Sequence, residues 1–402
     1  MTTISTAFTY YLDSYRGFSA PVWWLALATL VNRAGAMVLP FLSLYLTSSL
    51  GFTLSEVGWV MTFFGIGSFV GAWLGGELSH RIGAYRTMIL SLVLSAGCFV
   101  MLGYMRQLGW ICAGMFLTSL VADLFRPAVF VSLATYARPE NRTRAITLIR
   151  LAINLGFAMG PALGGLIIVA SGYGSLFWID GATCFIAGLL IFLSLKEKPQ
   201  VGVEESAASR HSHARILGDH KYMLFLLGLF LFGALFFQFF STIPVYYKTV
   251  RLLSEDEVGW LLSLNGLLIF FTEMPLIYAL EKPGKSNFRI IIFSALLLAG
   301  SYVAIVLHPW NGLLIVGMVL ATVAEMLCFP FTNSYAMERG GRGNEGRYMA
   351  YYSMTFSLSH ILGHNLGMQT SALFGFDVLF AVMIFLSLVS GTIFWWVGKS
   401  SH

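Results

Sequence analysis

The sequence predicts an all-α integral membrane protein with twelve transmembrane helices arranged as two bundles of six. Of its 402 residues, 57% are hydrophobic and 11% are charged, whereas about 25% of the residues in an ordinary soluble domain are charged. Apolar stretches long enough to cross a bilayer recur along the chain, and each crossing helix needs roughly 20 such residues. One long polar interval separates the first six stretches from the last six.

Each predicted span is an apolar run bounded by polar or glycine-containing loops. We expect the spans of the first bundle at 20–46, 57–77, 87–105, 108–136, 146–171 and 176–195. Those of the second bundle are expected at 222–246, 258–280, 288–307, 311–336, 347–375 and 377–397. The predicted domains are therefore an N-terminal bundle over 1–195, a cytoplasmic central loop over 196–221 and a C-terminal bundle over 222–402.

The basic residues predict the orientation in the membrane. If the N-terminus is cytoplasmic, 18 of the 24 Lys and Arg residues lie in inside loops or termini, and only Arg106, Lys248 and Arg251 lie outside. Cytoplasmic loops carry an excess of basic residues, and an even number of spans returns the chain to its starting side. We expect a multi-pass protein of the inner (cytoplasmic) membrane with both termini in the cytoplasm.

Composition argues against several other classes of function. The net charge of +5 is scattered over short loops, so we expect no nucleic-acid partner. The four cysteines (Cys98, Cys112, Cys184 and Cys328) lie inside apolar stretches without metal-ligand spacing, so we expect no metal site. The chain has no nucleophile elbow, zinc-protease motif or Walker loop, which makes a polytopic membrane enzyme the weaker alternative and leaves no predicted catalytic residues.

The two halves also resemble diverged copies of one another. At an offset of 203 residues, Pro127 corresponds to Pro330, Arg144 to Arg347 and Gly160 to Gly363. An internal repeat of this kind is typical of secondary transporters built from two related bundles.

The loop after the second predicted span carries a partial family signature, in which Gly76, Arg81, Gly83 and Arg86 stand at the matching positions. This pattern resembles the loop signature of the major facilitator superfamily. His80 occupies the place of the usual acid. In the superfamily this loop stabilises one conformational state, and the resemblance implies that role for these four residues.

The fifth predicted span contains a more specific motif. Gly156, Gly160 and Gly164 recur every four residues on one helix face, and Pro161 interrupts the backbone hydrogen bonding. The motif is similar to the fifth-helix signature of the drug/proton antiporter branch of the superfamily. The resemblance implies the major facilitator fold, in which two six-helix bundles alternate access to a central site, driven by a proton gradient and without a cofactor.

Ionisable residues within the spans are the candidates for proton coupling, because a charge at this depth is costly and is retained for a function. Glu325 and Glu273 are candidate proton carriers, since buried carboxylates can take up protons near neutral pH. Asp123 and Arg126 form either a structural salt bridge or part of the proton path, and Arg126 fits the fourth-helix arginine of the antiporters.

Other polar residues within the spans are candidates for binding substrate. Arg33 has no acid within reach on its own helix, so we expect it to pair with another helix or with an anionic group of the substrate. The predicted substrate-binding residues are Asn32, Arg33, Asn154, Gln238, Asn265 and His360.

Together these patterns predict a monomeric, proton-coupled secondary transporter whose partners are small amphipathic solutes, protons and the lipid bilayer. The fifth-span motif favours efflux by antiport. The stretches around Asn32-Arg33 and Asn154 resemble proton-coupled peptide carriers, so import of peptides or other small metabolites by symport is the alternative.

Overall fold

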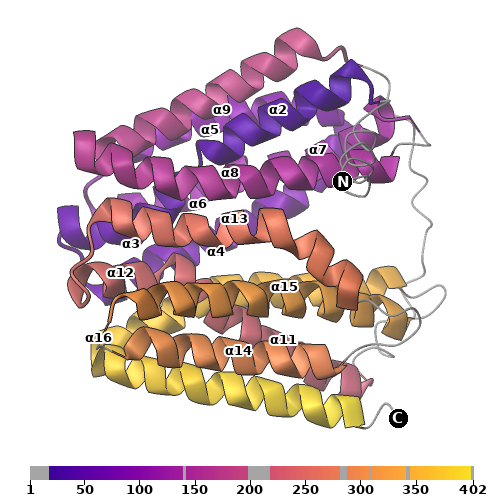
Figure 1. The fold of residues 1–402 in the computed structure, drawn as a ribbon. Coiled ribbons are helices and arrows are strands. Elements are labelled where there is room, and N and C mark those ends of the chain that lie inside the picture. The colour runs from indigo at the N-terminus through magenta and orange to yellow at the C-terminus, as the bar shows by residue number, and fades with distance from the viewer. Residues whose placement is uncertain are drawn as a thin grey trace, which may run out of the picture. The chain divides into compact units, whose positions relative to one another are not determined.

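The computed structural model describes residues 18–138, 142–197, 218–280, 288–307, 310–340 and 345–399. Within these ranges eleven helices are long and apolar enough to cross a membrane, and there is no strand. The last of them, α16 (Glu345–Lys399), consists of two helices joined at Gly375, where φ is 82°. Glycine adopts this conformation without steric cost. Counted with this division, the described helices agree with the predicted twelve spans. Figure 1 shows the described helices with their labels.

The helices group into two compact units. The first unit contains the chain up to Met37 with Ile66–Gly160 and Gly174–Glu204, and the second contains Val38–Gly65, Pro161–Tyr173 and the chain from Glu205. These units do not follow the predicted boundaries, because two stretches of the first half of the chain belong to the second unit. The division into two six-helix bundles stays a prediction, and most of the predicted central loop, 196–221, lies outside the described residues.

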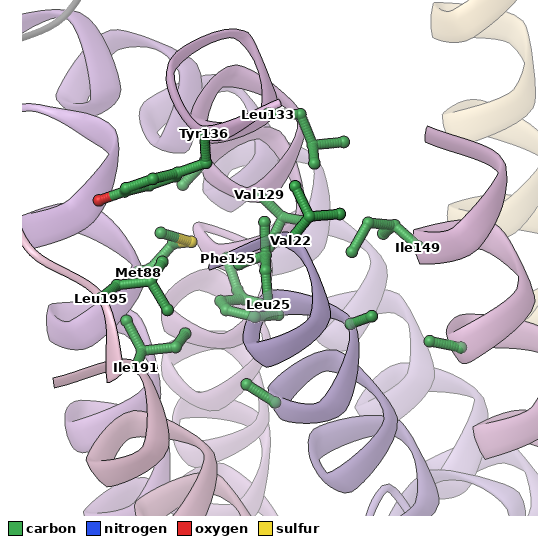
Figure 2. Close-up of a cluster of buried hydrophobic side chains, with 14 of the residues drawn as sticks. Val22, Leu25, Met88, Phe125, Val129, Leu133, Tyr136, Ile149, Ile191 and Leu195 are labelled. Carbon is green, nitrogen blue, oxygen red and sulfur yellow. The ribbon is translucent and has the colours of Figure 1, made fainter. Parts of the chain in front are cut away.

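The first unit is built from five whole helices and parts of two more. These are α2 (Ala20–Ala34), α5 (Ala84–Leu102), α6 (Leu108–Ala122), α7 (Phe125–Tyr136) and α9 (Gly174–Ser194), with the end of α4 (Leu54–Arg81) and the beginning of α8 (Arg142–Ser171). Figure 2 shows the cluster that holds them together, in which Val22 and Leu25 of α2 lie among Phe125 and Val129 of α7 and Ile191 of α9. Within lipid such contacts stabilise helix pairs through close packing.

The second unit contains the remaining helices. They are α3 (Val38–Leu44), the π-helix η1 (Tyr45–Ser49), α11 (His220–Phe236), the 3₁₀ turn η4 (Phe237–Phe240), α12 (Thr242–Thr249), α13 (Glu255–Leu280), α14 (Phe288–Val306), α15 (Gly312–Gly340) and α16. Helices α14, α15 and α16 lie side by side (Figure 1). Aromatic residues dominate the core of this unit, with Tyr222, Phe225 and Phe394 fully buried.

Three predicted spans are interrupted rather than continuous. The first breaks at Gly35–Met37, where the backbone N–H of Met37 donates to the Asp180 carboxylate at 3.0 Å instead of to the helix. The fourth breaks at Asp123–Leu124, because Pro127 has no N–H to bond the carbonyl four residues earlier. The seventh breaks between α11 and α12. Some candidate site residues lie at these breaks: Arg33 just before the first, Asp123 in the fourth and Gln238 in the seventh.

Candidate functional site

A carboxylate lies between two helices of the second unit. Asn265 of α13 donates through Nδ2 to Oε2 of Glu325 on α15 at 2.8 Å, and the same nitrogen lies 3.1 Å from the hydroxyl of Thr322. Asn265 and Thr322 are buried, and Glu325 is partly buried. Glu325, a predicted proton carrier, and Asn265, a predicted substrate-binding residue, are thus in direct contact.

The second predicted acid is close to the first. Glu273, also on α13, lies near enough for its charge to act on Glu325. In the part of the chain that the structure describes, no Lys or Arg forms an ion pair with Glu325. Two carboxylates are therefore neighbours within helices that are apolar enough to span a membrane, and one of them, Glu325, accepts a hydrogen bond from an amide.

The first unit holds a separate group of candidate residues around an arginine. Arg33 lies on the last turn of α2, and its Nε is buried without a hydrogen-bond partner in the part of the chain that the structure describes. The charges of Asp123 and Arg126 act on it from the break between α6 and α7. Next to it, Asn32 donates through Nδ2 to the sulfur of Cys184 on α9 at 3.4 Å.

Asp123 and Arg126 form no ion pair in the described residues, so the structural salt bridge considered from the sequence is absent there. Asp123 caps α6, whereas Arg126 lies in the first turn of α7 with an exposed side chain. Asn154, on α8, is partly buried.

Gln238 and His360 lie near the break in the seventh span. The Gln238 amide nitrogen donates to the carbonyls of Ala234 and Gly363, and its oxygen accepts from the Thr242 hydroxyl at 2.6 Å. The ring of His360 lies 4.5 Å from Phe237 and 4.7 Å from His364 between centroids. Gln238 therefore stabilises the break itself, and its predicted role in substrate binding stays a prediction.

One buried acid was not predicted from the sequence. Asp180 of α9 is 1% exposed and accepts the hydrogen bond from Met37 that stabilises the first break. Its signal in the sequence is a single acid inside the sixth apolar span, the same signal that marks Glu273 and Glu325.

The glycines of the α8 motif allow close helix packing. A side chain at Gly156 would collide with Arg33, and one at Gly160 would touch the backbone carbonyls of Ala34 and Ala36 at 3.4–3.5 Å. Gly164 is buried. Beyond Pro161 the same helix contacts α13, because a side chain at Gly165 would meet the backbone of Glu255 at 2.6 Å. The first part of the motif therefore packs α8 on α2, beside Arg33.

The loop motif lies between α4 and α5. Arg81 pairs with Glu77 at 2.6 Å, and Arg86 pairs with Glu197 at 2.7 Å. Gly83 has a φ of 92°, which favours glycine, whereas the position of Gly76 has open space around it. Both arginines of the motif have acidic partners, although His80 occupies the usual position of the acid.

Comparison with known families agrees with this architecture. The family model of the Major Facilitator Superfamily matches residues 25–364 and 251–402. The chain belongs to the Major Facilitator Superfamily. As a member of this superfamily it is a membrane transporter and not an enzyme.

Relatives in the superfamily cover most of the chain. The uncharacterized MFS-type transporter YttB of Bacillus subtilis strain 168 is 21% identical, covering 91% of this chain and 92% of its own. Multidrug resistance protein MdtH of Aeromonas hydrophila is 24% identical over 85% of both chains. Inner membrane transport protein YajR of Escherichia coli K12 is 25% identical over 88% of this chain and 77% of its own.

Solved structures of superfamily transporters share the fold. A variant of the nucleoside transporter NupG superposes with a TM-score of 0.80 at 14% identity, covering 94% of this chain and 99% of its own. The peptide transporter POT in complex with sulfate gives a TM-score of 0.78 at 14% identity, over 96% of both chains. At this identity the likeness shows the major facilitator fold alone.

Proposed function

We propose that the protein is a proton-coupled secondary transporter that exports small amphipathic solutes in exchange for protons. We place it in the inner membrane as a monomer with both termini in the cytoplasm. The observation that carries the proposal is the Glu325 carboxylate, which lies within a membrane span, hydrogen-bonded to Asn265 and without a cation beside it in the described residues.

Such a carboxylate is suited to carrying a proton. A charged group inside a membrane is unfavourable unless it is paired or hydrated, and Glu273 places a second acid close to Glu325. Asn265 can hold the group in both protonation states, because its amide nitrogen donates to the ionised carboxylate and its oxygen can accept from the protonated one. Protonation from one side and release to the other then accompanies alternating access.

The relatives support the direction of transport. MdtH is named as a multidrug resistance protein, which fits export of varied apolar compounds. YajR is named as an inner membrane transport protein, which fits the proposed location. The Gly-Pro motif of α8 supports the same assignment through its similarity to the antiporter branch.

The direction of coupling can be tested in everted membrane vesicles whose lumen is acidified by respiration. A thermal-shift screen of the purified protein first supplies a bound solute. Adding that solute to the vesicles should make the lumen more alkaline, because entry of the solute into the lumen is exchanged for protons. Acidification of the lumen would instead indicate symport and contradict the proposed antiport.

The proton carrier can be tested with two variants. We expect Glu325→Gln to abolish the solute-dependent pH change while exchange of labelled for unlabelled solute continues, because a neutral amide cannot carry the proton. Glu273→Gln tests the second acid in the same way. Glu338→Gln, an exposed glutamate on the same helix as Glu325, is the matched control. Unchanged coupled transport in both span variants would refute the assignment.

A further inference from the structure

Arg33 carries hydrogen-bonding capacity that the described part of the chain does not satisfy. Its Nε is buried and without a partner, and its guanidinium makes no hydrogen bond or ion pair there. A guanidinium has five N–H donors and stays charged in proteins. Buried donors without acceptors are costly, and charged residues in membrane spans are usually paired or placed for substrates and ions.

The surroundings of Arg33 leave a surplus of positive charge. The charges of Asp123 and Arg126, at the α6–α7 break, both act on Arg33. This group therefore contains one carboxylate and two guanidiniums. Asp180 on α9 accepts the Met37 N–H at the helix break. The cluster therefore favours an additional anion.

Helix α8 lies close to Arg33, because a side chain added at Gly156 would collide with the Cβ and backbone of Arg33. On α8 the residue packed against it is Gly156, which has no side chain. Two neutral amides lie close in sequence to this contact, Asn32 beside Arg33 and Asn154 two residues before Gly156. Amide N–H groups can donate to the same oxyanion as a guanidinium.

We propose that the transported solute carries an oxyanion, a carboxylate, sulfonate or phosphonate, that binds the Arg33 guanidinium. The planar fork of an arginine matches such groups with two parallel hydrogen bonds. This inference rests on the proposed transport of a small amphipathic solute and names its chemical class. An amphipathic anion satisfies the donors of Arg33 and offsets the surplus positive charge near Arg126 and Asp123.

The test is binding to the purified full-length protein in detergent, where no proton gradient exists. The probes share one apolar body and differ only in charge: 1-naphthoate and 1-naphthalenesulfonate are anionic, 1-naphthamide is neutral and 1-naphthylmethylammonium is cationic. We expect the anions to raise the melting temperature of the wild-type protein and the cation and the amide to have little effect.

The variants assign the effect to Arg33. Arg33→Gln should weaken binding of the anions at least tenfold. The affinity of Arg33→Lys should lie between those of the wild type and Arg33→Gln, because lysine keeps the positive charge but lacks the planar, two-pronged guanidinium. Arg106→Gln, an exposed arginine of the same unit, is the control. Binding is measured without a proton gradient, so a failure of proton coupling remains distinguishable from a failure of anion binding.

Three results would overturn the inference. They are equal stabilisation by the neutral or cationic probe, undiminished anion binding by Arg33→Gln, and absence of stabilisation by either anion. If Arg33→Gln does not fold, the wild-type comparison of the matched probes and the affinity of Arg33→Lys decide the question.

Discussion

At the scale of single residues, the surroundings of each acid determine what it can do. Asp219, just before α11, accepts two hydrogen bonds from Arg339 at 2.9 and 3.0 Å and one from the Tyr348 hydroxyl at 3.1 Å. Burial raises the pKa of Asp219, but these bonds and the backbone N–H of Tyr222 outweigh it and hold the pKa below its ordinary value. Asp219 is therefore a structural acid that joins α11, α15 and α16, whereas none of the described residues forms such an ion pair with Glu325.

This difference predicts a pH-dependent stability. Because the folded pKa of Asp219 is depressed, its contribution is present above the ordinary aspartate value of about 3.9 and is lost as the pH falls through the lower folded value. We expect Asp219→Asn to lower the free energy of unfolding by about 1–2 kcal/mol at pH 7, allowing for the partial exposure of Arg339. Titration with SDS in mixed micelles measures this.

The same titration at lower pH checks the cause. The difference between Asp219→Asn and the wild type should shrink as the pH is lowered from 5 towards 3, roughly the range in which a depressed aspartate becomes protonated. Asp377→Asn, an exposed acid of α16, should have little effect at either pH. A difference that does not depend on pH would mean that Asp219 acts through packing and neutral hydrogen bonds alone.

At the scale of elements, corresponding helices of the predicted repeat have similar surroundings. Gly160 packs against carbonyls of Ala34 and Ala36 at the break of the first span. At Gly363, its predicted counterpart, an added Cβ would lie 2.8 Å from the backbone of Ala234, shortly before the break of the seventh span. In both places a glycine allows a helix to approach the point where its neighbour is interrupted, which supports the repeat inferred from the sequence.

Because α8 lies close to α2, we expect a side chain added at their contact to destabilise the protein more than one added in an open position. We expect Gly156→Ala to lower the free energy of unfolding by about 1–3 kcal/mol, because the new methyl group would meet Arg33 and the backbone of Ala34, and overpacking forces such neighbours apart. Gly97→Ala is the matched control, since nothing lies within 4 Å of its added carbon. Equal effects of the two variants would show that α8 and α2 are not tightly packed there.

At the scale of the whole molecule, the distribution of basic residues predicts the topology in the membrane. The loops with Arg81 and Arg138 fall on the predicted cytoplasmic side, and those with Arg106 and Arg251 on the other. Twelve crossings place both termini on one side. The orientation determines which side of the membrane supplies the protons, so the proposed export depends on it.

Cysteine labelling tests this orientation. The four native cysteines lie in the spans and can be replaced to provide a cysteine-free background. We expect single cysteines at Gln107 or Arg251 to react with a membrane-impermeant maleimide in intact cells, and single cysteines at Arg138 or Lys399 to react only after the membrane is opened. The reverse pattern would place the termini outside and contradict the proposed topology.

Much of the fold could be predicted from local sequence. Span length and apolar composition identified the crossings, including the two that are joined at Gly375, because any helix within lipid must be apolar over a fixed length. The helix breaks were missed. The composition of a single apolar segment does not reveal that Asp180 accepts a hydrogen bond from the N–H of Met37, since the two residues are 143 positions apart.

The candidate site was predicted in part for the same reason. An acid or an arginine inside an apolar span is conspicuous by itself, so Arg33, Asp123, Glu273 and Glu325 could be identified from the sequence. Their partners could not, because the Asn265–Glu325 hydrogen bond joins different helices. The position of Asp123 at a break between α6 and α7 was also unforeseen.

The sequence by itself determined that this protein is a membrane transporter of twelve helices with ionisable groups within its spans, because the cost of placing polar groups in lipid acts on each segment separately. Only the tertiary structure decided how those groups combine. Packing of α13 on α15 gives Glu325 an amide partner, whereas the Arg33 Nε on α2 is buried without a hydrogen-bond partner among the described residues. The physical reason is that pairing between charges depends on distances between helices, which no single segment contains.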